Sequence, residues 1–331
     1  MSSTMSRRTF SVASIASVLG GAAVLATPVG RALAQGAATA AAQGGADLAS
    51  AGLPTLDITV TKDGFDGMTD SVAAGRYLVT VTVAEGLESG AVGFVSPGPG
   101  STVDDLLMVM GGGAMPEGSP PAADASPAAE GEGGGEEGAP PTFVYQAHFA
   151  GGASAMPGMP AQVALDLTPG DWVLWADEPG AAQAPMTFTA TGDMPADLPE
   201  PAADIMVTFI DFGITVEGSL TAGDHILHIE NQGAQPHFLF LAKGPDTMTN
   251  DDIATILDAE MSGQMTPEAL PFNPDTDLMP VLASGTQSIG TVTWVHASLE
   301  AGTYAALCFF PTAGEGLPHA FHGMHTVFTV S

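Results

Sequence analysis

Hydrophobic and polar residues alternate along most of this chain in short runs that end at glycine or proline. The run LVTVTV at 78–83 is one example, and IMVTFI at 205–210 is another. Alternation with a period of two predicts β-strands with one buried face. Many short strands between Gly/Pro turns, with few helical runs, predict an all-β chain built as antiparallel Greek-key β-sandwiches.

The strand pattern occurs twice in the same order. The run that begins at Leu56 matches the run that begins at Ala203, and each has an Ala-Gly turn before its second strand, at 74–75 and 222–223. Three further anchors follow in both copies: a short helix with a Ser/Thr cap, a strand entered through a Gly turn, and a final strand. The chain is therefore predicted to hold two similar β-sandwiches, each with one short helix.

Composition divides the chain into segments. The first sandwich is predicted for 54–192, a linker for 193–202 and the second sandwich for 203–331. Residues 111–141 consist almost entirely of Gly, Pro, Ala and Glu, so this insert in the first copy has little to bury and is predicted to be disordered.

The N-terminus carries the pattern of an export signal. Arg7 and Arg8 precede an Ala/Gly-rich apolar run, and Ala32-Leu33-Ala34 supplies a cleavage site with small residues. Residues 1–34 are predicted to be a twin-arginine signal peptide, with a membrane anchor as the alternative. The mature protein is then expected in the periplasm, in the cell envelope or outside the cell. No later segment is apolar enough to predict a membrane span.

The chain is strongly acidic, with a formal net charge of −31. Removal of 1–34 would leave Lys62, Arg76 and Lys243 against 37 aspartates and glutamates. Such a surface repels nucleic acid and anionic lipid, so neither is expected as a partner. It suits a basic protein partner, or saline or acidic surroundings.

The single cysteine lies in the C-terminal stretch CFFPTAGEGLPHAFHGMH, residues 308–325. An unpaired cysteine in an exported protein indicates an intermolecular disulfide, a reactive thiol, a metal ligand or an inert buried thiol. Histidine and methionine follow Cys308 closely, and the segment NQGAQPH places His237 at the start of another strand.

These residues resemble the motif of the cupredoxins, the blue copper proteins. Their pattern is an early histidine after an Asn/Gly-rich turn and a late loop that supplies cysteine, histidine and methionine. The resemblance covers about 205–331 and implies one type 1 copper, with His237, Cys308 and His319 as strong ligands and Met324 as the weak axial ligand.

The loop departs from the family in its length. Ten residues, 309–318, separate Cys308 from His319, where family members place only a few. His322 is therefore kept as the reserve ligand. The first copy aligns Ala176 with Cys308 and has no histidine in 89–95, so it is expected to bind no type 1 copper.

The remaining motifs bear on enzyme chemistry. The resemblance implies that multicopper oxidases and copper nitrite reductases carry a histidine beside the cysteine, whereas Leu307 and Phe309 flank Cys308 here, and no His-x-His pair occurs. No hydrolase elbow or phosphate-binding glycine motif is present. The sequence thus predicts no enzyme of these classes, and His148, His225, His228 and His296 are predicted to be structural.

Two functions fit these observations. The first is an exported copper-binding protein that carries single electrons to and from a redox partner. The second is a metal-free, cupredoxin-like cell-surface or interaction protein whose copper site has decayed.

Overall fold

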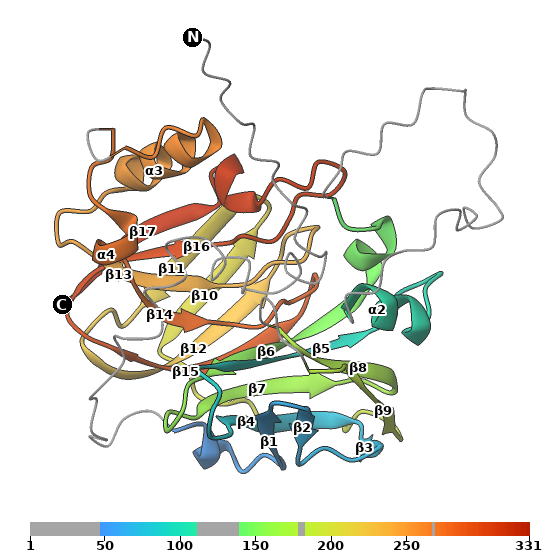
Figure 1. The fold of residues 1–331 in the computed structure, drawn as a ribbon. Helices are drawn as coiled ribbons and strands as arrows, with labels where there is room; N and C mark the ends of the chain where they lie inside the picture. Colours follow the sequence, from blue (N-terminus) through green and yellow to red (C-terminus); the bar gives the residue numbers. More distant parts are fainter. Residues whose placement is uncertain (1–46, 111–138, 178–182, 267–268) are drawn as a thin grey trace, which may run out of the picture.

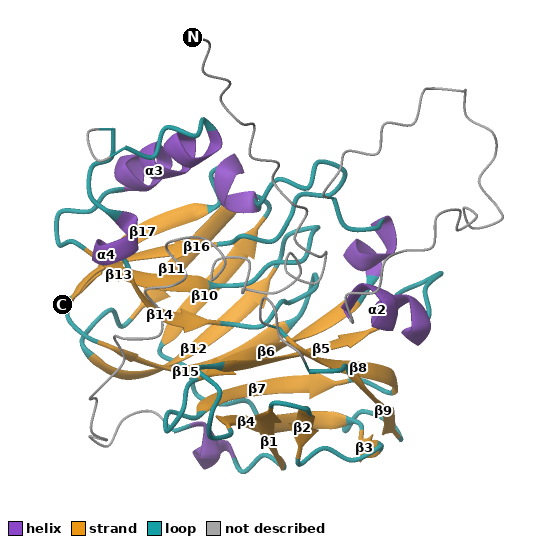
Figure 2. Ribbon diagram, in the orientation of Figure 1, coloured by secondary structure: helices purple, strands orange, loops and turns teal. Residues whose placement is uncertain are grey.

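The computed structural model describes residues 47–110, 139–177, 183–266 and 269–331. Strands dominate these ranges and the helices are few and short (Figure 2), so the predicted all-β class is confirmed. The predicted signal peptide 1–34, and residues 111–138 of the predicted insert, lie outside the described residues.

The first half of the described chain begins with a short 3-10 helix, η4 (Leu48–Ala51), and contains a second one, η5 (Thr142–Gln146), and one α-helix, α2 (Val103–Met110). Its strands are β1 (Thr55–Thr61), β2 (Gly64–Asp66), β3 (Ser71–Ala73), β4 (Gly75–Val83), β5 (Gly90–Ser96), β6 (His148–Ala155), β7 (Ala161–Leu167), β8 (Gly170–Ala176) and β9 (Met186–Thr191).

The second half has helices α3 (Asn250–Met261), α4 (Pro274–Asp277) and η6 (His319–His322). Its strands are β10 (Ile205–Ile210), β11 (Gly213–Gly218), β12 (Gly223–Asn231), β13 (Phe240–Gly244), β14 (Met279–Ala283), β15 (Val292–Leu299), β16 (Gly302–Leu307) and β17 (His325–Val330). Across the described ranges, none of the helices has the length and apolarity that crossing a bilayer requires.

Strand pairing repeats between the halves. The pairs β1–β2, β1–β4, β4–β7, β5–β8 and β8–β9 correspond to β10–β11, β10–β12, β12–β15, β13–β16 and β16–β17. The N-terminal half is thus a degenerate copy of the C-terminal half, as the sequence predicted. One pair in each half, β1–β4 and β10–β12, is parallel rather than antiparallel. In the first half the chain crosses to the opposite sheet at β3 and then returns, so β4 can run in the same direction as β1.

The halves share one sheet. The 8-stranded sheet runs β11-β10-β12-β15-β7-β4-β1-β2, so β15 of the second half pairs with β7 of the first. The 4-stranded sheet β14-β13-β16-β17 belongs to the second half, and the 5-stranded sheet β3-β9-β8-β5-β6 to the first (Figure 1). Buried side chains such as Val207, Leu227, Leu241 and Ala306 fill the space between the sheets of the second half. The segment boundaries 54–192, 193–202 and 203–331 stay predictions.

Local chemistry fixes the ends of several elements. Helix α3 begins at a capping box in which Thr249 and Asp252 exchange side-chain and backbone hydrogen bonds. Strands β8 and β16 begin at Gly170 and Gly302, whose φ angles of 142° and 146° are open to glycine and strained for other residues. Because β16 leads directly to Cys308, this turn fixes where the thiol leaves the sheet.

Candidate metal centre

His237 follows a turn that Asn231 organises from within. The buried Asn231 side chain accepts a hydrogen bond from the Gly233 N–H at 2.9 Å and donates to the carbonyl oxygens of Gln235 and Gln287 at 2.9 and 2.8 Å. The His237 backbone pairs in both directions with Gln287, at 3.0 and 2.8 Å. These bonds fix the backbone from which the imidazole projects.

The ten-residue loop between Cys308 and His319 closes on itself. Pro311 and Pro318 form an antiparallel bridge, and the Thr312 N–H donates to the Leu317 carbonyl at 2.8 Å. The chain therefore leaves and returns at the same place. The His319 N–H donates to Phe310 O at 2.9 Å, so the extra residues form a hairpin outside the site.

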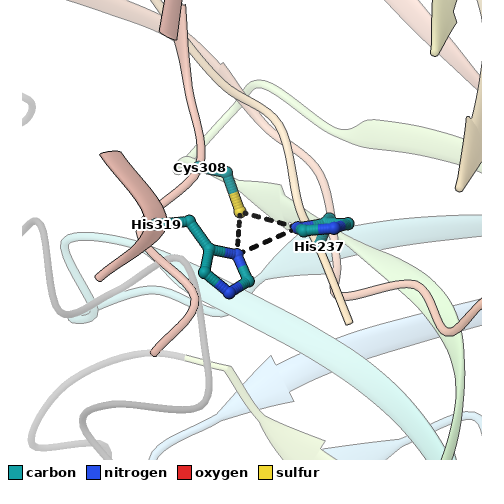
Figure 3. A group of neighbouring side chains, drawn as sticks. All are labelled: His237, Cys308 and His319. Carbon is teal, nitrogen blue, oxygen red and sulfur yellow. Dashed lines mark hydrogen bonds between the residues drawn. The ribbon is translucent and has the colours of Figure 1, made fainter. Parts of the chain in front are cut away.

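The side chains of His237, Cys308 and His319 meet in one buried cluster (Figure 3). The Nδ1 atoms of the two histidines lie 3.0 Å apart, and each lies 3.6 Å from the Cys308 Sγ. All three residues have 0% exposure. In the described part of the chain, no other group of three histidines, cysteines or acids is close enough to share a metal ion.

The outer ring nitrogens face oxygen acceptors. His237 Nε2 lies 3.2 Å from Asp211 Oδ1, and His319 Nε2 lies 3.4 Å from Gln235 Oε1. Gln235 Oε1 also accepts from the Ala313 N–H at 2.8 Å, which identifies it as the amide oxygen. Each Nε2 therefore carries the ring proton, and both Nδ1 lone pairs point toward the thiol.

Burial keeps all three groups uncharged in the absence of metal. It lowers the pKa of His237 to about 4, although Asp211 acts to raise it. Burial, with His237 nearby, lowers the pKa of His319 to about 3. Burial raises the pKa of the Cys308 thiol to about 12. The cluster thus presents two neutral imidazoles and a thiol in an apolar pocket.

The turn between β10 and β11 supplies two residues to the surroundings of the site. Asp211 reaches His237, and the ring of Phe212 lies edge-on to His319 with centroids 5.5 Å apart. Phe212 has a φ of 59°, which is strained for a residue other than glycine. Sequence reasoning missed both residues. The strand–Asp-Phe-Gly–strand pattern marks the turn, but no local signal shows what it faces.

Met324 and His322 differ in where they lie. Met324 is fully buried, and its backbone accepts from the Cys308 N–H at 3.2 Å and donates to the His319 carbonyl at 3.1 Å. His322 is partly exposed, with Nε2 3.2 Å from Glu315 Oε2. The structure places Met324 beside the cluster and turns His322 toward the hairpin.

The four histidines predicted to be structural have contacts of their own. His225 contacts Asp204 at 2.6 Å, His296 lies 3.6 Å from Asp224, and the rings of His148 and His228 pack edge-on to Trp172 and Trp294. In the first half the shared register places Ala176 where the second half has Cys308.

The donor set fits copper. Two lone pairs 3.0 Å apart have only the thiol proton between them, an arrangement that a cation would stabilise. The three donor atoms lie 3.0 to 3.6 Å from one another, close enough for one ion to contact all of them. Two imidazoles and a thiolate beside a methionine are the donors of a type 1 copper site.

Comparisons with known proteins return cupredoxins among solved structures. No protein-family model and no curated protein matches the chain. Reduced auracyanin from Roseiflexus castenholzii is 22% identical over 39% of this chain and 98% of its own, with a TM-score of 0.25. Copper nitrite reductase from Nitrosomonas europaea is 10% identical over 84% and 93%, with a TM-score of 0.20. Multicopper oxidase from Pediococcus acidilactici is 11% identical over 85% and 59%, with a TM-score of 0.22.

One sequence expectation is corrected by these comparisons. The chain was predicted to lie outside the copper enzymes because Leu307 and Phe309 flank Cys308. Structures of both enzyme classes nevertheless match it over 84% and 85% of its length. That exclusion was wrong.

The predicted resemblance to the cupredoxins is confirmed for the fold and for the presence of a His-Cys-His cluster. The C-terminal half has a cupredoxin-like β-sandwich, and His237, Cys308 and His319 converge at one end of it.

Proposed function

We propose that this protein is exported by the twin-arginine pathway, binds one type 1 copper in its C-terminal half and transfers single electrons. The observation that carries the proposal is the buried triangle of two Nδ1 atoms and one Sγ, with both Nε2 atoms held by outer acceptors. His237, Cys308 and His319 would be the strong ligands, and Met324 the axial ligand. Bound copper would supply a one-electron Cu(I)/Cu(II) couple.

The residues around the cluster contribute orientation and exclusion of water. Asp211 and Gln235 fix the tautomer and the angle of each imidazole. Cys308 would have to lose its thiol proton to become a ligand, and the bond to copper would offset the high pKa that burial imposes. The packed strands around the site limit the rearrangement of ligands between oxidation states, which favours rapid electron transfer.

The copper proposal is tested by absorption of the copper-reconstituted protein. Wild type is expected to show an intense thiolate-to-copper band. Cys308→Ser is expected to lose the band, because a hydroxyl cannot replace the thiolate. Cys308 is buried, so circular dichroism of the variant checks that the fold survives. A wild type that stays colourless with Cu(II) would instead favour the metal-free interaction protein.

The role of Met324 is tested by measuring the reduction potential of the copper-loaded protein. Met324→Leu conserves volume and apolarity, and is expected to keep the copper and its band. Loss of the weak axial thioether favours Cu(I), so the potential should rise. A redox titration followed by absorbance measures it. An unchanged potential would remove Met324 from the ligand set.

Export is tested on the protein from its native host. The mature N-terminus is expected at Gln35, directly after Ala34. N-terminal sequencing of the exported protein decides this. Membrane-bound material that retains Met1 would contradict the proposed cleavage.

A basic redox partner would suit the acidic chain. Attraction between opposite charges accelerates encounter and weakens as salt screens it. Electron exchange with a cationic redox reagent should therefore slow as ionic strength rises, while exchange with an anionic one should accelerate.

A further inference from the structure

The segment 284–288 lies between the copper ligand and the first half of the chain. On one side Gln287 pairs with His237, and the Leu239 N–H donates to Ser284 Oγ at 2.9 Å. On the other side it meets β6: Ala150 bridges Gln287, and the Gly285 N–H donates to Gly152 O at 3.0 Å. Hydrogen bonds therefore run from β6 to His237 through this one segment.

The Gln287 side chain locks the segment in place. Gln287 has 0% exposure, and its Nε2 donates to the carbonyl oxygens of Ile229 and Thr291 at 3.0 and 3.1 Å. Its Oε1 accepts from the Thr293 hydroxyl at 3.1 Å. These partners lie on β12, on β15 or directly before β15. Gln287 thus ties the backbone opposite His237 to the sheet that joins the two halves.

Backbones approach closely where the segment meets β6. A β-carbon on Gly285 would lie 2.1 Å from the Gly152 nitrogen, and one on Gly151 would lie 2.7 Å from the Thr293 methyl group. Ser288 adds two bonds across the contact, accepting from the Phe149 N–H at 2.9 Å and donating to Ala147 O at 2.8 Å. At Gly285 and Gly152 the two backbones meet directly, so a shift of β6 passes to the segment.

The first half also supports the loop that carries the other ligands. Phe310, two residues after Cys308, packs edge-on against Tyr145 and Phe149, with centroids 5.8 and 6.1 Å apart. The Tyr145 hydroxyl donates to Thr312 O at 3.3 Å. The first half therefore contacts both polypeptide segments from which the ligands project.

We propose that the first half, in whose described residues no second metal-ligand cluster lies, positions His237 through β6 and the segment 284–288, with Gln287 as the central positioning residue. This inference rests on the proposed function of the cluster, since it assigns a role in holding that site. The proposed role of the degenerate copy is therefore to support the metal centre.

The test loosens the contact without touching a ligand. Gly285→Ala places a methyl group against Gly152, and Ser288→Ala removes two hydrogen bonds without adding volume. The control for the first is Gly75→Ala, where the nearest atoms lie at 3.9 and 4.0 Å. The control for the second is Ser96→Ala, which removes one exposed bond within the first half.

Two readouts separate positioning from general stability. In the metal-free protein, the His237 amide should exchange its hydrogen about tenfold faster in either test variant, while amides of β16 exchange as in wild type. In the copper-loaded protein, the absorption band and the copper hyperfine splitting should shift in the test variants and stay unchanged in both controls.

The outcomes distinguish the two proposals. If wild type shows the copper band and neither test variant alters the band or the His237 exchange, the positioning role is wrong and the copper function stands. If wild type shows no band but the test variants accelerate His237 exchange, the copper function is wrong and the mechanical link stands. If Gly285→Ala fails to fold, Ser288→Ala decides by the same measurements.

Discussion

Hydrogen bonds to the outer ring nitrogens determine the tautomers of the two histidines in the cluster. Asp211 and Gln235 each accept a hydrogen bond from the outer N–H of an imidazole, which leaves both Nδ1 lone pairs facing Cys308. Asp211 is itself held in place, accepting from the Ala234 and Gln235 N–H groups at 2.9 and 3.3 Å. Burial acts to raise the pKa of Asp211, but these bonds and His237 hold it below its ordinary value. A carboxylate thus lies one imidazole away from the proposed metal.

Asp211 is predicted to set both copper affinity and reduction potential. Asp211→Asn keeps an acceptor for His237 and removes a negative charge that favours Cu(II), so the potential should rise with little loss of copper. Asp211→Ala removes the acceptor as well and should weaken copper binding about 10- to 100-fold. Redox titration and competition with a copper chelator measure the two effects. Equal potentials in wild type and Asp211→Asn would contradict the electrostatic role.

Sequence reasoning found the cluster because its residue types are rare. The chain has one cysteine, and histidines follow it at a spacing that a known motif explains. It missed Asp211 and Gln287 because each reaches His237 from a distant part of the chain, 26 and 50 residues away in sequence. The chain holds 37 acids, and without the tertiary fold nothing distinguishes one of them.

At the scale of elements, the hairpin 309–318 determines which histidine joins the cluster. Its Pro311–Pro318 bridge returns the chain to Phe310, so His319 enters the pocket at the start of η6. His322 lies at the other end of η6 and faces Glu315, within the hairpin. A long insertion therefore coexists with a compact site, because its two ends are held together.

His322→Ala is accordingly predicted to keep the copper and its absorption band. Its contact with Glu315 is an exposed ion pair at most, worth below about 1 kcal/mol, so stability should change little. His319→Ala is the matched comparison and should lose the band. Spectra of both variants after copper reconstitution decide the assignment. Loss of the band in His322→Ala with retention in His319→Ala would transfer the ligand role to His322.

Strand positions could be predicted because alternation and Gly/Pro turns are local signals. The capped helix predicted for the second copy appears as α3, and the predicted final strand appears as β17. The pairing of β7 with β15 could not be predicted, because it depends on which edges of two sandwiches meet. The parallel pairs β1–β4 and β10–β12 were also missed, since a strand pattern carries no direction.

At the scale of the whole molecule, the shared sheet joins the two halves through the pairing of β7 with β15. Leu48 and Leu53 cover the junction of β7 and β15, packing with Ala164 and Trp294. Arg76, on β4, binds both carboxylate oxygens of Asp166 at 2.7 and 2.9 Å and donates to Pro199 O at 3.1 Å. Its guanidinium lies 4.3 Å from the centre of the Trp294 ring. One side chain thus joins the first half, the predicted linker and the second half.

Arg76 is predicted to stabilise this junction more than a typical ion pair would. Arg76→Met leaves Asp166 and the Pro199 carbonyl without their donor and removes the contact with Trp294, at a cost of about 2 to 4 kcal/mol. Arg76→Lys keeps the charge but cannot make the forked, stacked arrangement, so it should recover only part of the loss. Urea unfolding measures the free energy of unfolding of both variants.

The matched control is Lys243→Met, which breaks the solvent-exposed pair with Glu300 and should cost less than about 1 kcal/mol. If Arg76→Met costs no more than this control, the junction is held by apolar packing and strand pairing, and Arg76 is incidental to it.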